Sequence, residues 1–167
     1  LEGAGAHRPN LRIVSVPQVG TQELQNDFRG KWEVADPENV KRFTAIGYLY
    51  GRYLHDILNV PVGLINNAWG GSAAEAWVRR ETIEKDPRFA LLMQRTRTRE
   101  SDLTTGKADI EARWKADSEK AVAAKKKAAP NPLAWLTGNA RPGNIFAGVV
   151  HPTLGYGIKG VVWYQGE

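Results

Sequence analysis

Two apolar runs that end in glycine-bearing polar residues constrain the fold of this chain more than any other feature. Residues 60–66 lead into Gly70 and Gly71, and residues 158–164 lead into Gln165. The first run is apolar throughout rather than alternating, which is typical of a strand covered on both faces. Ligands of open parallel α/β sheets bind in the crevice beyond the carboxyl ends of the strands. The two runs therefore predict a parallel sheet with a binding site at these strand ends.

A further strand and an amphipathic helix are expected before these runs. Residues 11–16 are rich in β-branched side chains and stop at Pro17, which predicts a strand. After Pro37, apolar residues recur at three- and four-residue steps, so a helix with one apolar stripe is expected. Gly47 and Gly51 would let this helix approach a sheet closely. The stripe consists of Phe43, Ile46, Gly47, Tyr50, Leu54, Ile57 and Leu58.

The rest of the chain predicts loops and helices. Residues 17–36 show no sustained period and predict a loop. Ser72 is followed three residues later by Glu75, the spacing of a capping box, which predicts a helix that begins just after Gly71. The alternation of strands and helices indicates an α/β protein. Further helices are expected over residues 87–99, 107–128 and 145–150.

Length and composition fit one globular domain. The chain has 167 residues, of which 42% are hydrophobic, and no cysteine, so disulfides and thiolate metal sites are excluded. Its three histidines are scattered, and we expect neither a metal nor a cofactor. No stretch approaches the roughly 20 apolar residues of a membrane span. The first residues lack the pattern of a signal peptide and also lack Met, so we expect the natural protein to start upstream.

The net charge of +5 depends strongly on residues 79–130, a charged excursion. Lysine and arginine alternate there with aspartate and glutamate for most of its length, which is typical of solvated helices. Nucleic-acid binding would require an uncompensated basic face with aromatic residues, and Trp114 is the only aromatic residue in the densest part. We therefore expect no nucleic-acid partner; steeply salt-dependent retention of DNA would be needed to support one.

The glycine pair favours a site that stabilises negative charge. The amides of Gly71, Ser72 and Ala73 lie in the first turn of the expected helix, where N–H groups have no intrahelical partner. Such amides stabilise an oxygen that gains charge in a transition state, although a plain strand-to-helix turn is the alternative. A nucleophilic Ser72 would need Gly-x-Ser-x-Gly, but Ala74 replaces the last glycine, and capping explains the hydroxyl. The carboxamide of Gln165 is a further donor suited to an oxyanion.

Four segments carry these motifs in a fixed order: residues 43–54, 60–66, 69–77 and 158–167. The third contains Trp-Gly-Gly-Ser, and the fourth ends in Gln-Gly-Glu. Together they strongly resemble the sialate O-acetylesterase family, carbohydrate esterases of the SGNH-hydrolase type. The resemblance covers nearly all of the chain except the charged excursion.

This resemblance implies a serine esterase that removes acetyl groups from sugar hydroxyls. It assigns the backbone N–H of Gly71 and the side-chain amide of Gln165 to the oxyanion hole. Gly70 would shape the approach to Gly71, and Glu167 matches the motif as a supporting residue. The expected substrate is an O-acetylated sugar or glycan, with no membrane partner and no cofactor. A secreted, periplasmic or lysosomal location is also implied.

The chain departs from the family pattern in two ways. The Gly-Gln-Ser-Asn run that carries the family's serine is absent, and His151 matches a non-catalytic His-Pro rather than the catalytic histidine. We therefore expect an internal piece of a longer esterase, inactive alone, whose partner is the remainder of the same polypeptide. Residues 1–167 would form part of an SGNH-type domain, with residues 79–130 as a helical insertion.

The resemblance implies a flavodoxin-like three-layer α/β fold with a parallel sheet of order 2-1-3-4-5. Residues 11–16, 60–66 and 160–164 would be strands 2, 3 and 4, so strand 1 would be missing between the first two. The alternative to an esterase is a non-catalytic carbohydrate-binding or scaffold domain of the same fold. Its pocket would be lined by Trp69, Trp77 and Trp163.

Overall fold

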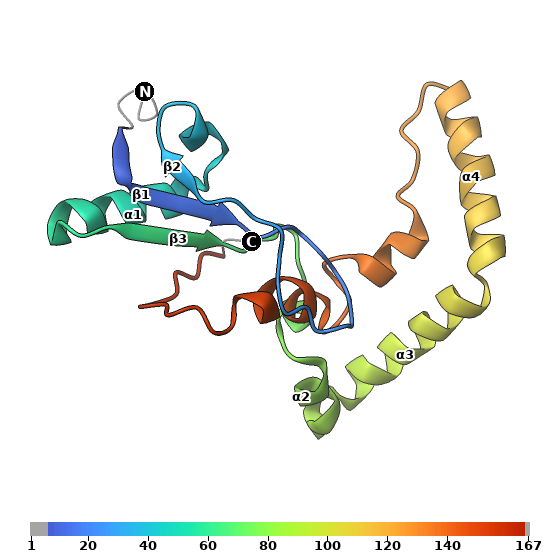
Figure 1. Ribbon diagram of the computed structural model, residues 1–167. Coiled ribbons are helices and arrows are strands. Elements are labelled where there is room, and N and C mark those ends of the chain that lie inside the picture. The colour runs from blue at the N-terminus through green and yellow to red at the C-terminus, as the bar shows by residue number, and fades with distance from the viewer. Residues whose placement is uncertain (1–6, 166–167) are drawn as a thin grey trace. The chain divides into compact units, whose positions relative to one another are not determined.

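A short mixed sheet and a series of helices make up this α/β chain, whose computed structural model describes residues 7–165 (Figure 1). The described residues divide into unit 1 (7–17, 27–68 and 153–165) and unit 2 (18–26 and 69–152). The elements are β1 (Arg8–Ser15), β2 (Glu33–Ala35), η2 (Asn39–Arg42), α1 (Ala45–Leu58), β3 (Val62–Asn66), η3 (Ala74–Trp77), α2 (Arg80–Lys85), η4 (Pro87–Phe89), α3 (Ala90–Thr105), α4 (Lys107–Ala123), η5 (Pro132–Thr137), the π-helix η6 (Phe146–Val150) and η7 (His151–Thr153).

The sheet of unit 1 has the order β2-β1-β3. β1 is central, and its side chains Leu11, Ile13 and Val14 are buried. β1 and β3 are parallel and in register from Leu11 opposite Val62 to Ser15 opposite Asn66. The two predicted strands at 11–16 and 60–66 are thus confirmed, together with their parallel direction. The antiparallel β2, in a segment expected to be a loop, was not predicted.

The expected gap for a missing strand between β1 and β3 is wrong. The two strands pair directly with each other, which satisfies backbone N–H and C=O groups that a gap would leave unpaired. β3 is an edge strand of this sheet, and its side chains are half-buried or exposed. The apolar sequence of residues 60–66 predicted a strand covered on both faces, whereas β3 is covered only in part.

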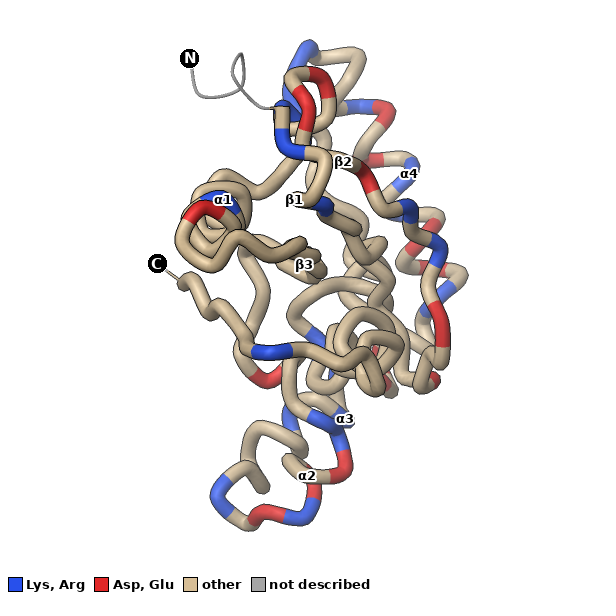
Figure 2. Tube along the Cα trace, turned by 60° about the vertical axis from the view of Figure 1, so that its left-hand side comes forward, with Lys and Arg blue, Asp and Glu red and all other residues tan. Residues whose placement is uncertain are grey.

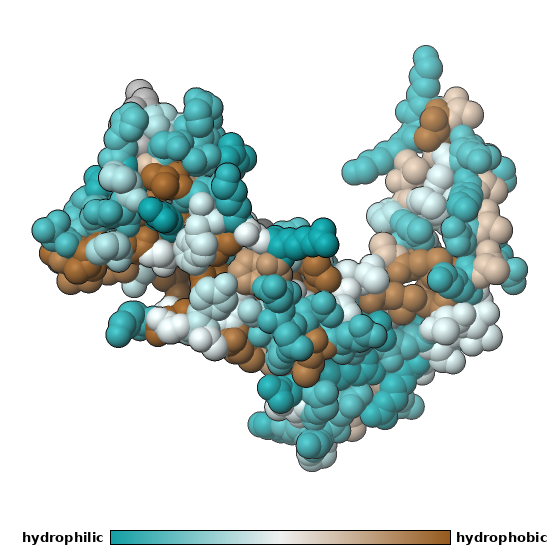
Figure 3. All heavy atoms as spheres, viewed as in Figure 1, coloured by the Kyte–Doolittle hydropathy of each residue, from teal (hydrophilic) through white to brown (hydrophobic). Residues whose placement is uncertain are grey.

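Helix α1 is confirmed, but its buried face differs from the predicted stripe. The Thr44 hydroxyl accepts a hydrogen bond from the Gly47 amide at the N-terminus. Tyr48 and Gly51 are the buried helix residues, and a Cβ on Gly51 would lie 2.8 Å from Leu64 Cδ1. The close approach expected at Gly51 is thus present. Four residues of the predicted stripe are exposed instead: Ile46, Tyr50, Ile57 and Leu58. Hydrophobic residues are visible at the surface near the C-terminal end of α1 (Figure 3).

The strand predicted over residues 160–164 is absent. Val161 and Trp163 are 77% and 66% exposed, and the run joins no sheet among the described residues. An extended apolar run becomes a strand only when a neighbour pairs with its backbone, because a lone strand leaves those groups without partners.

The helices α2, α3 and α4 of unit 2 cover most of the charged excursion. Basic and acidic residues are interspersed along α4 (Figure 2), as in the pair Lys115–Glu111 at 3.0 Å, whereas α3 carries three arginines before its two acidic residues. α3 buries Met93, Thr96 and Leu103, whereas α4 buries no residue. The helices predicted at 87–99 and 107–128 are therefore confirmed as elements.

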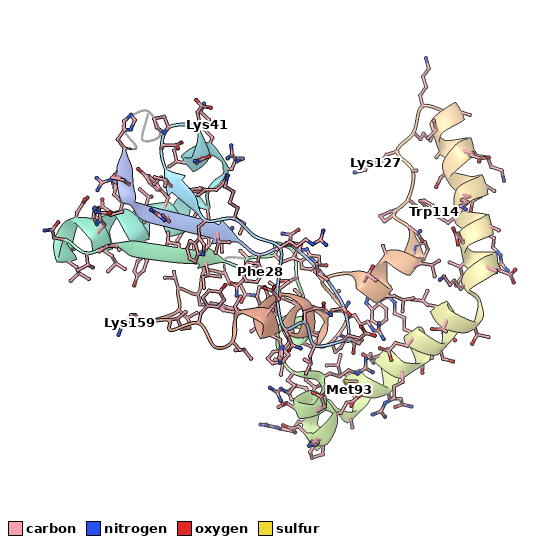
Figure 4. All side chains as sticks on the ribbon, viewed as in Figure 1. Phe28, Lys41, Met93, Trp114, Lys127 and Lys159 are labelled. Atoms are coloured by element: carbon pink, nitrogen blue, oxygen red, sulfur yellow. The ribbon has the colours of Figure 1, made fainter. Side chains whose placement is uncertain are left out.

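Trp114 ties α4 to the segment that returns after it. Its indole N–H donates a hydrogen bond to Ala129 O, 2.9 Å away (Figure 4). The one aromatic residue in the densest part of the charged excursion thus makes an internal contact. The short helix predicted over residues 145–150 is also present, as the π-helix η6.

Candidate functional site: the Gly70–Gly71 turn

Gly70 and Gly71 form a turn in unit 2 that is open to its surroundings. Gly71 has φ +65°, in the left-handed region where a side chain is disfavoured. A Cβ built on either glycine would meet no heavy atom within 4 Å. Among the described residues, none accepts a hydrogen bond from the amide of Gly71 or Ser72. The turn therefore presents backbone N–H groups that a ligand oxygen can approach.

The capping box predicted at Ser72 and Glu75 is wrong. The element that follows is η3, a single 3-10 turn, and its N-cap is Ala73, which makes no side-chain capping bond. The Ser72 hydroxyl instead accepts a hydrogen bond from the indole N–H of Trp77 at 2.8 Å. The amide of Ala73 is also engaged, because it donates to Asn139 O at 3.1 Å. Of the three amides expected to face an anion, only those of Gly71 and Ser72 have no hydrogen-bond acceptor among the described residues.

Asn139 holds the glycine turn on both sides. Its side-chain amide donates to Gly70 O at 2.9 Å, and its own carbonyl accepts from the Ala73 amide. Gly71 lies between these two anchors, so its orientation is fixed from the loop that carries Asn139. Sequence reasoning missed this residue, because Asn139 follows Gly70 by 69 positions and no local spacing connects the two.

Asn144 fixes the loop in which Asn139 lies. Its side chain is fully buried, and its amide donates to Leu136 O at 3.1 Å and to Gly138 O at 2.8 Å. Its side-chain oxygen accepts from Gln22 Nε2 at 2.6 Å. A buried side-chain amide whose oxygen and nitrogen both have hydrogen-bond partners holds the neighbouring backbone in one arrangement. The carbonyls just before Asn139 are therefore held in place from inside unit 2.

Glu100 joins two arginines behind the same loop. Arg80 Nη1 lies 2.5 Å and Arg141 Nε 2.7 Å from Glu100 Oε1, and Arg141 also donates to Leu136 O at 3.0 Å. The hydrogen bond from Arg80 holds the pKa of the Glu100 carboxyl below its usual value, and the bond and charge of Arg141 act in the same direction. The same ion pair raises the pKa of Arg80, which stays charged at any working pH. Glu100 is thus a carboxylate that links α2, α3 and the Asn139 loop.

The other predicted site residues lie in unit 1 or beyond the described range. Gln165 is exposed and outside any helix or strand. Glu167 lies outside the described residues, so its supporting role stays a prediction. Gly70 and Gly71 share one turn in unit 2, whereas Gln165 belongs to unit 1. The convergence of Gly71 and Gln165 on one oxygen therefore also stays a prediction.

His151 has a structural partner within unit 2. Its Nδ1 lies 2.7 Å from Gln25 O, and its ring meets Phe146 edge-on with centroids 6.1 Å apart. These contacts hold His151 against the segments that carry Gln25 and Phe146, and its lack of a catalytic role stays a prediction. Across residues 7–165, no group of three or more metal-ligating side chains is close enough to hold an ion. None of the helices in that range has the length and apolar character needed to cross a bilayer.

Comparisons with known proteins extend over almost the whole chain. The sialate O-acetylesterase of Mus musculus is 30% identical over 167 residues, and that of Homo sapiens is 27% identical over 166 residues. Both alignments cover 95% of this chain, but only 29% and 25% of the respective relatives. The chain therefore spans between a quarter and three tenths of the length of these relatives. No protein-family model matches the chain.

A solved structure gives a concordant result. A carbohydrate acetylesterase from Xanthomonas citri superposes with a TM-score of 0.65 at 26% sequence identity. The match covers 99% of this chain and 27% of that protein. The small mixed sheet and its helices are thus consistent with part of an acetylesterase fold.

Proposed function

Because the chain resembles the sialate O-acetylesterase family over 95% of its length, we propose that it is part of a carbohydrate O-acetylesterase. The intact protein would hydrolyse acetyl esters on sugar hydroxyls. In this proposal the present residues supply the oxyanion hole through the Gly71 amide and the Gln165 carboxamide, with Gly70 shaping the approach and Glu167 in support. The family implies a secreted, periplasmic or lysosomal location for the intact protein.

The open Gly70–Gly71 turn is the observation that carries this proposal. The turn has space beside both glycines, and the Gly71 amide has no acceptor among the described residues. Asn139 holds its flanks, so the amide direction is set before any substrate arrives. Donors that are already oriented stabilise developing charge without reorganising during the reaction.

The proposed reaction proceeds in two acyl-transfer steps. A serine oxygen from another part of the polypeptide forms a bond with the acetyl carbon, and the carbonyl oxygen becomes an anion held by Gly71 and Gln165. The ester C–O bond then breaks, and the sugar oxygen leaves with a proton. Water next attacks the acetyl-serine, releasing acetate and restoring the hydroxyl. The present residues contribute donors to both steps, but no nucleophile.

Acetate release by the intact protein tests the proposal. O-acetylated N-acetylneuraminic acid and acetylated xylan are suitable substrates, since they separate an acidic sugar from a neutral glycan. Gln165→Ala is expected to lower kcat by roughly 10²–10³-fold, the usual effect of one lost oxyanion donor. Gln94→Ala, at an exposed position of α3, is the matched control and should leave kcat unchanged. An unchanged kcat in Gln165→Ala would reject the assigned role.

The alternative is a carbohydrate-binding domain without catalysis. Its expected pocket of Trp69, Trp77 and Trp163 draws on residues of both units, so that pocket stays a prediction. Of these residues, Trp77 donates its indole N–H to the Ser72 hydroxyl at 2.8 Å. Sugar binding by the intact protein without release of acetate from any acetylated substrate would favour this alternative.

A further inference from the structure

One arginine closes the loop that holds the glycine turn. Arg141 Nη1 donates a hydrogen bond to Leu136 O at 3.0 Å, so this side chain closes residues 136–141 into a ring. Asn139, which holds the glycine turn on both sides, lies within this 136–141 ring. The position of Asn139 therefore depends on a segment whose two ends are joined by the Arg141 side chain.

The same guanidinium ties the 136–141 ring to helix α3. Arg141 Nε lies 2.7 Å from Glu100 Oε1, and the two side chains are only 19% and 18% exposed. The N–H groups of a guanidinium point in fixed directions within one plane. The bond to Glu100 therefore also sets the direction of the bond to Leu136 O, and the ring is held at a defined place on α3.

Arg80 provides a close comparison, because it shares the carboxylate of Glu100 but makes no bond to the ring. Its Nη1 lies 2.5 Å from Glu100 Oε1, and its side chain is 19% exposed, as is that of Arg141. In the described part of the chain, its other side-chain hydrogen bonds go to Glu84 and Gln22, outside the ring. Substitution of either arginine removes one charged partner of the carboxylate, but only substitution of Arg141 opens the ring.

We propose that Arg141 is a positioning residue for the proposed oxyanion hole, acting through Asn139 on the Gly70–Gly71 turn. The proposal deepens the proposed function and rests on it for the reaction that is affected. Loss of the Arg141 side chain would leave Leu136 O its second donor, Asn144 Nδ2 at 3.1 Å, so this carbonyl keeps a partner. The expected effect is therefore a misplaced catalytic donor in a folded unit.

Steady-state hydrolysis of p-nitrophenyl acetate by the intact protein tests this assignment. Arg141→Gln should lower kcat by roughly 10–100-fold and leave KM nearly unchanged, because a misplaced donor weakens binding of the transition state rather than of the substrate. Arg80→Gln, the matched control, should keep kcat near that of the unaltered protein, although it also removes a partner of Glu100. Equal losses of kcat in the two variants, or an unchanged kcat in Arg141→Gln, would overturn the proposal.

A double-substitution cycle tests the route through Asn139. If Arg141 acts through Asn139, Arg141→Gln should lower kcat little further once Asn139→Asp is present, because residues of one network are not additive. Losses that multiply would mean that Arg141 acts by another route and would overturn the proposal. Circular dichroism verifies that each variant is folded. If Arg141→Gln is unfolded, Arg141→Lys replaces it; kcat should then fall severalfold, because an ammonium lacks the planar fork that makes both bonds, and an unchanged kcat would overturn the proposal.

Hydrogen exchange separates this proposal from the proposed function. The Ala73 amide donates to Asn139 O at 3.1 Å, and its exchange reports how firmly the 136–141 ring holds that carbonyl. Arg141→Gln should therefore speed the exchange of a peptide that contains Ala73 severalfold more than Arg80→Gln does. An intact protein that shows this difference but releases no acetate would refute the proposed function and leave the hold of Arg141 on the turn intact. Equal exchange in the two variants would overturn that hold.

Discussion

Asn139 is the single residue whose loss should disturb the glycine turn most. It bonds Gly70 through its side chain and Ala73 through its backbone, on either side of Gly71. A side-chain substitution removes the first of these bonds and leaves the second. Gly71 would then keep its φ of +65° with only one anchored side. Asn139 is therefore a positioning residue for the proposed oxyanion hole.

Asn139→Asp should lower kcat for p-nitrophenyl acetate by roughly 10–100-fold in the intact protein, since small misplacements of a catalytic donor have effects of this size. The substitution keeps the shape of the side chain but turns the donor that faces Gly70 O into an acceptor. The substrate carries no sugar, so a lost contact with a sugar cannot account for the change. Steady-state kinetics provides the measurement, with the exposed Asn10→Asp as control. An unaltered kcat would show that the turn holds its shape without Asn139.

The Glu100 carboxylate makes the stability of unit 2 depend on pH. Its folded pKa is lowered from an ordinary value of 4.5, chiefly by the hydrogen bond from Arg80. A lowered folded pKa means that its ion pairs contribute fully to stability above the ordinary pKa, and that this contribution is lost as the pH falls toward and through the folded pKa. Stability should therefore decline on acidification below about pH 4.5, as measured by urea unfolding followed through tryptophan fluorescence.

Glu100→Gln should be less stable by about 2 kcal/mol at neutral pH, because two partly buried arginines lose a charged partner. Its stability should also change less between neutral pH and about pH 3 than that of the unaltered protein. Glu111→Gln, on the exposed face of α4, should change stability by less than about 0.5 kcal/mol. Parallel pH profiles for the unaltered protein and Glu100→Gln would contradict the role given to this carboxylate.

At the scale of elements, the sequence was sufficient wherever local pattern determines structure. It predicted β1, β3, α1, α3 and α4, because periodic apolar residues and helix-forming composition act within each segment. The prediction was wrong where the local structure depends on a contact with a residue distant in the sequence. The capping box predicted at Ser72 does not form, because the Ser72 hydroxyl accepts from the Trp77 indole and the Ala73 amide donates to Asn139 O. Residues 160–164 have the composition of a β-strand, but among the described residues they pair with no other strand. The network of Gln22, Glu100 and Asn144 was unpredicted for the same reason.

The packing of α1 on the sheet depends on the missing side chain at Gly51. A Cβ there would lie 2.8 Å from Leu64 Cδ1 and 2.9 Å from Leu11 Cδ1, and Leu11 is fully buried. Gly51→Leu should therefore destabilise unit 1 by about 1–3 kcal/mol through overpacking. Gly51→Ala adds only the Cβ, to which the ends of the two leucine side chains must adjust, and alanine gains roughly 0.5–1 kcal/mol of helix preference, so its loss of stability should be smaller. Urea unfolding of both variants gives the comparison, and equal stabilities of the leucine and alanine variants would contradict it.

At the scale of the whole molecule, the chain alternates between two units. It passes from one unit to the other four times, after residues 17, 26, 68 and 152. Each unit has its own internal bonds: the β1–β3 ladder in unit 1 and the Glu100 and Asn144 network in unit 2. A substitution that weakens one of these sets should therefore act first on its own unit.

Hydrogen exchange with mass spectrometry can follow the two units separately, since exchange reports local opening. Glu100→Gln should speed exchange in peptides from residues 69–152 and leave peptides from residues 27–68 near their original rates. Gly51→Leu should show the opposite distribution. Acceleration in both units by either variant would mean that they open together as one cooperative structure.

The absence of buried residues from α4 has a consequence for protein engineering. Glu100 pairs with Arg80 near the start of the charged excursion and with Arg141 beyond its end, while α4 has no fully buried residue. Substitutions at exposed positions of α4 should therefore change the free energy of unfolding by no more than about 0.5 kcal/mol, while the ion pairs of Glu100 stay in place. Helix α4 is thus the part of unit 2 in which new sequence can be introduced with the least disturbance of buried residues.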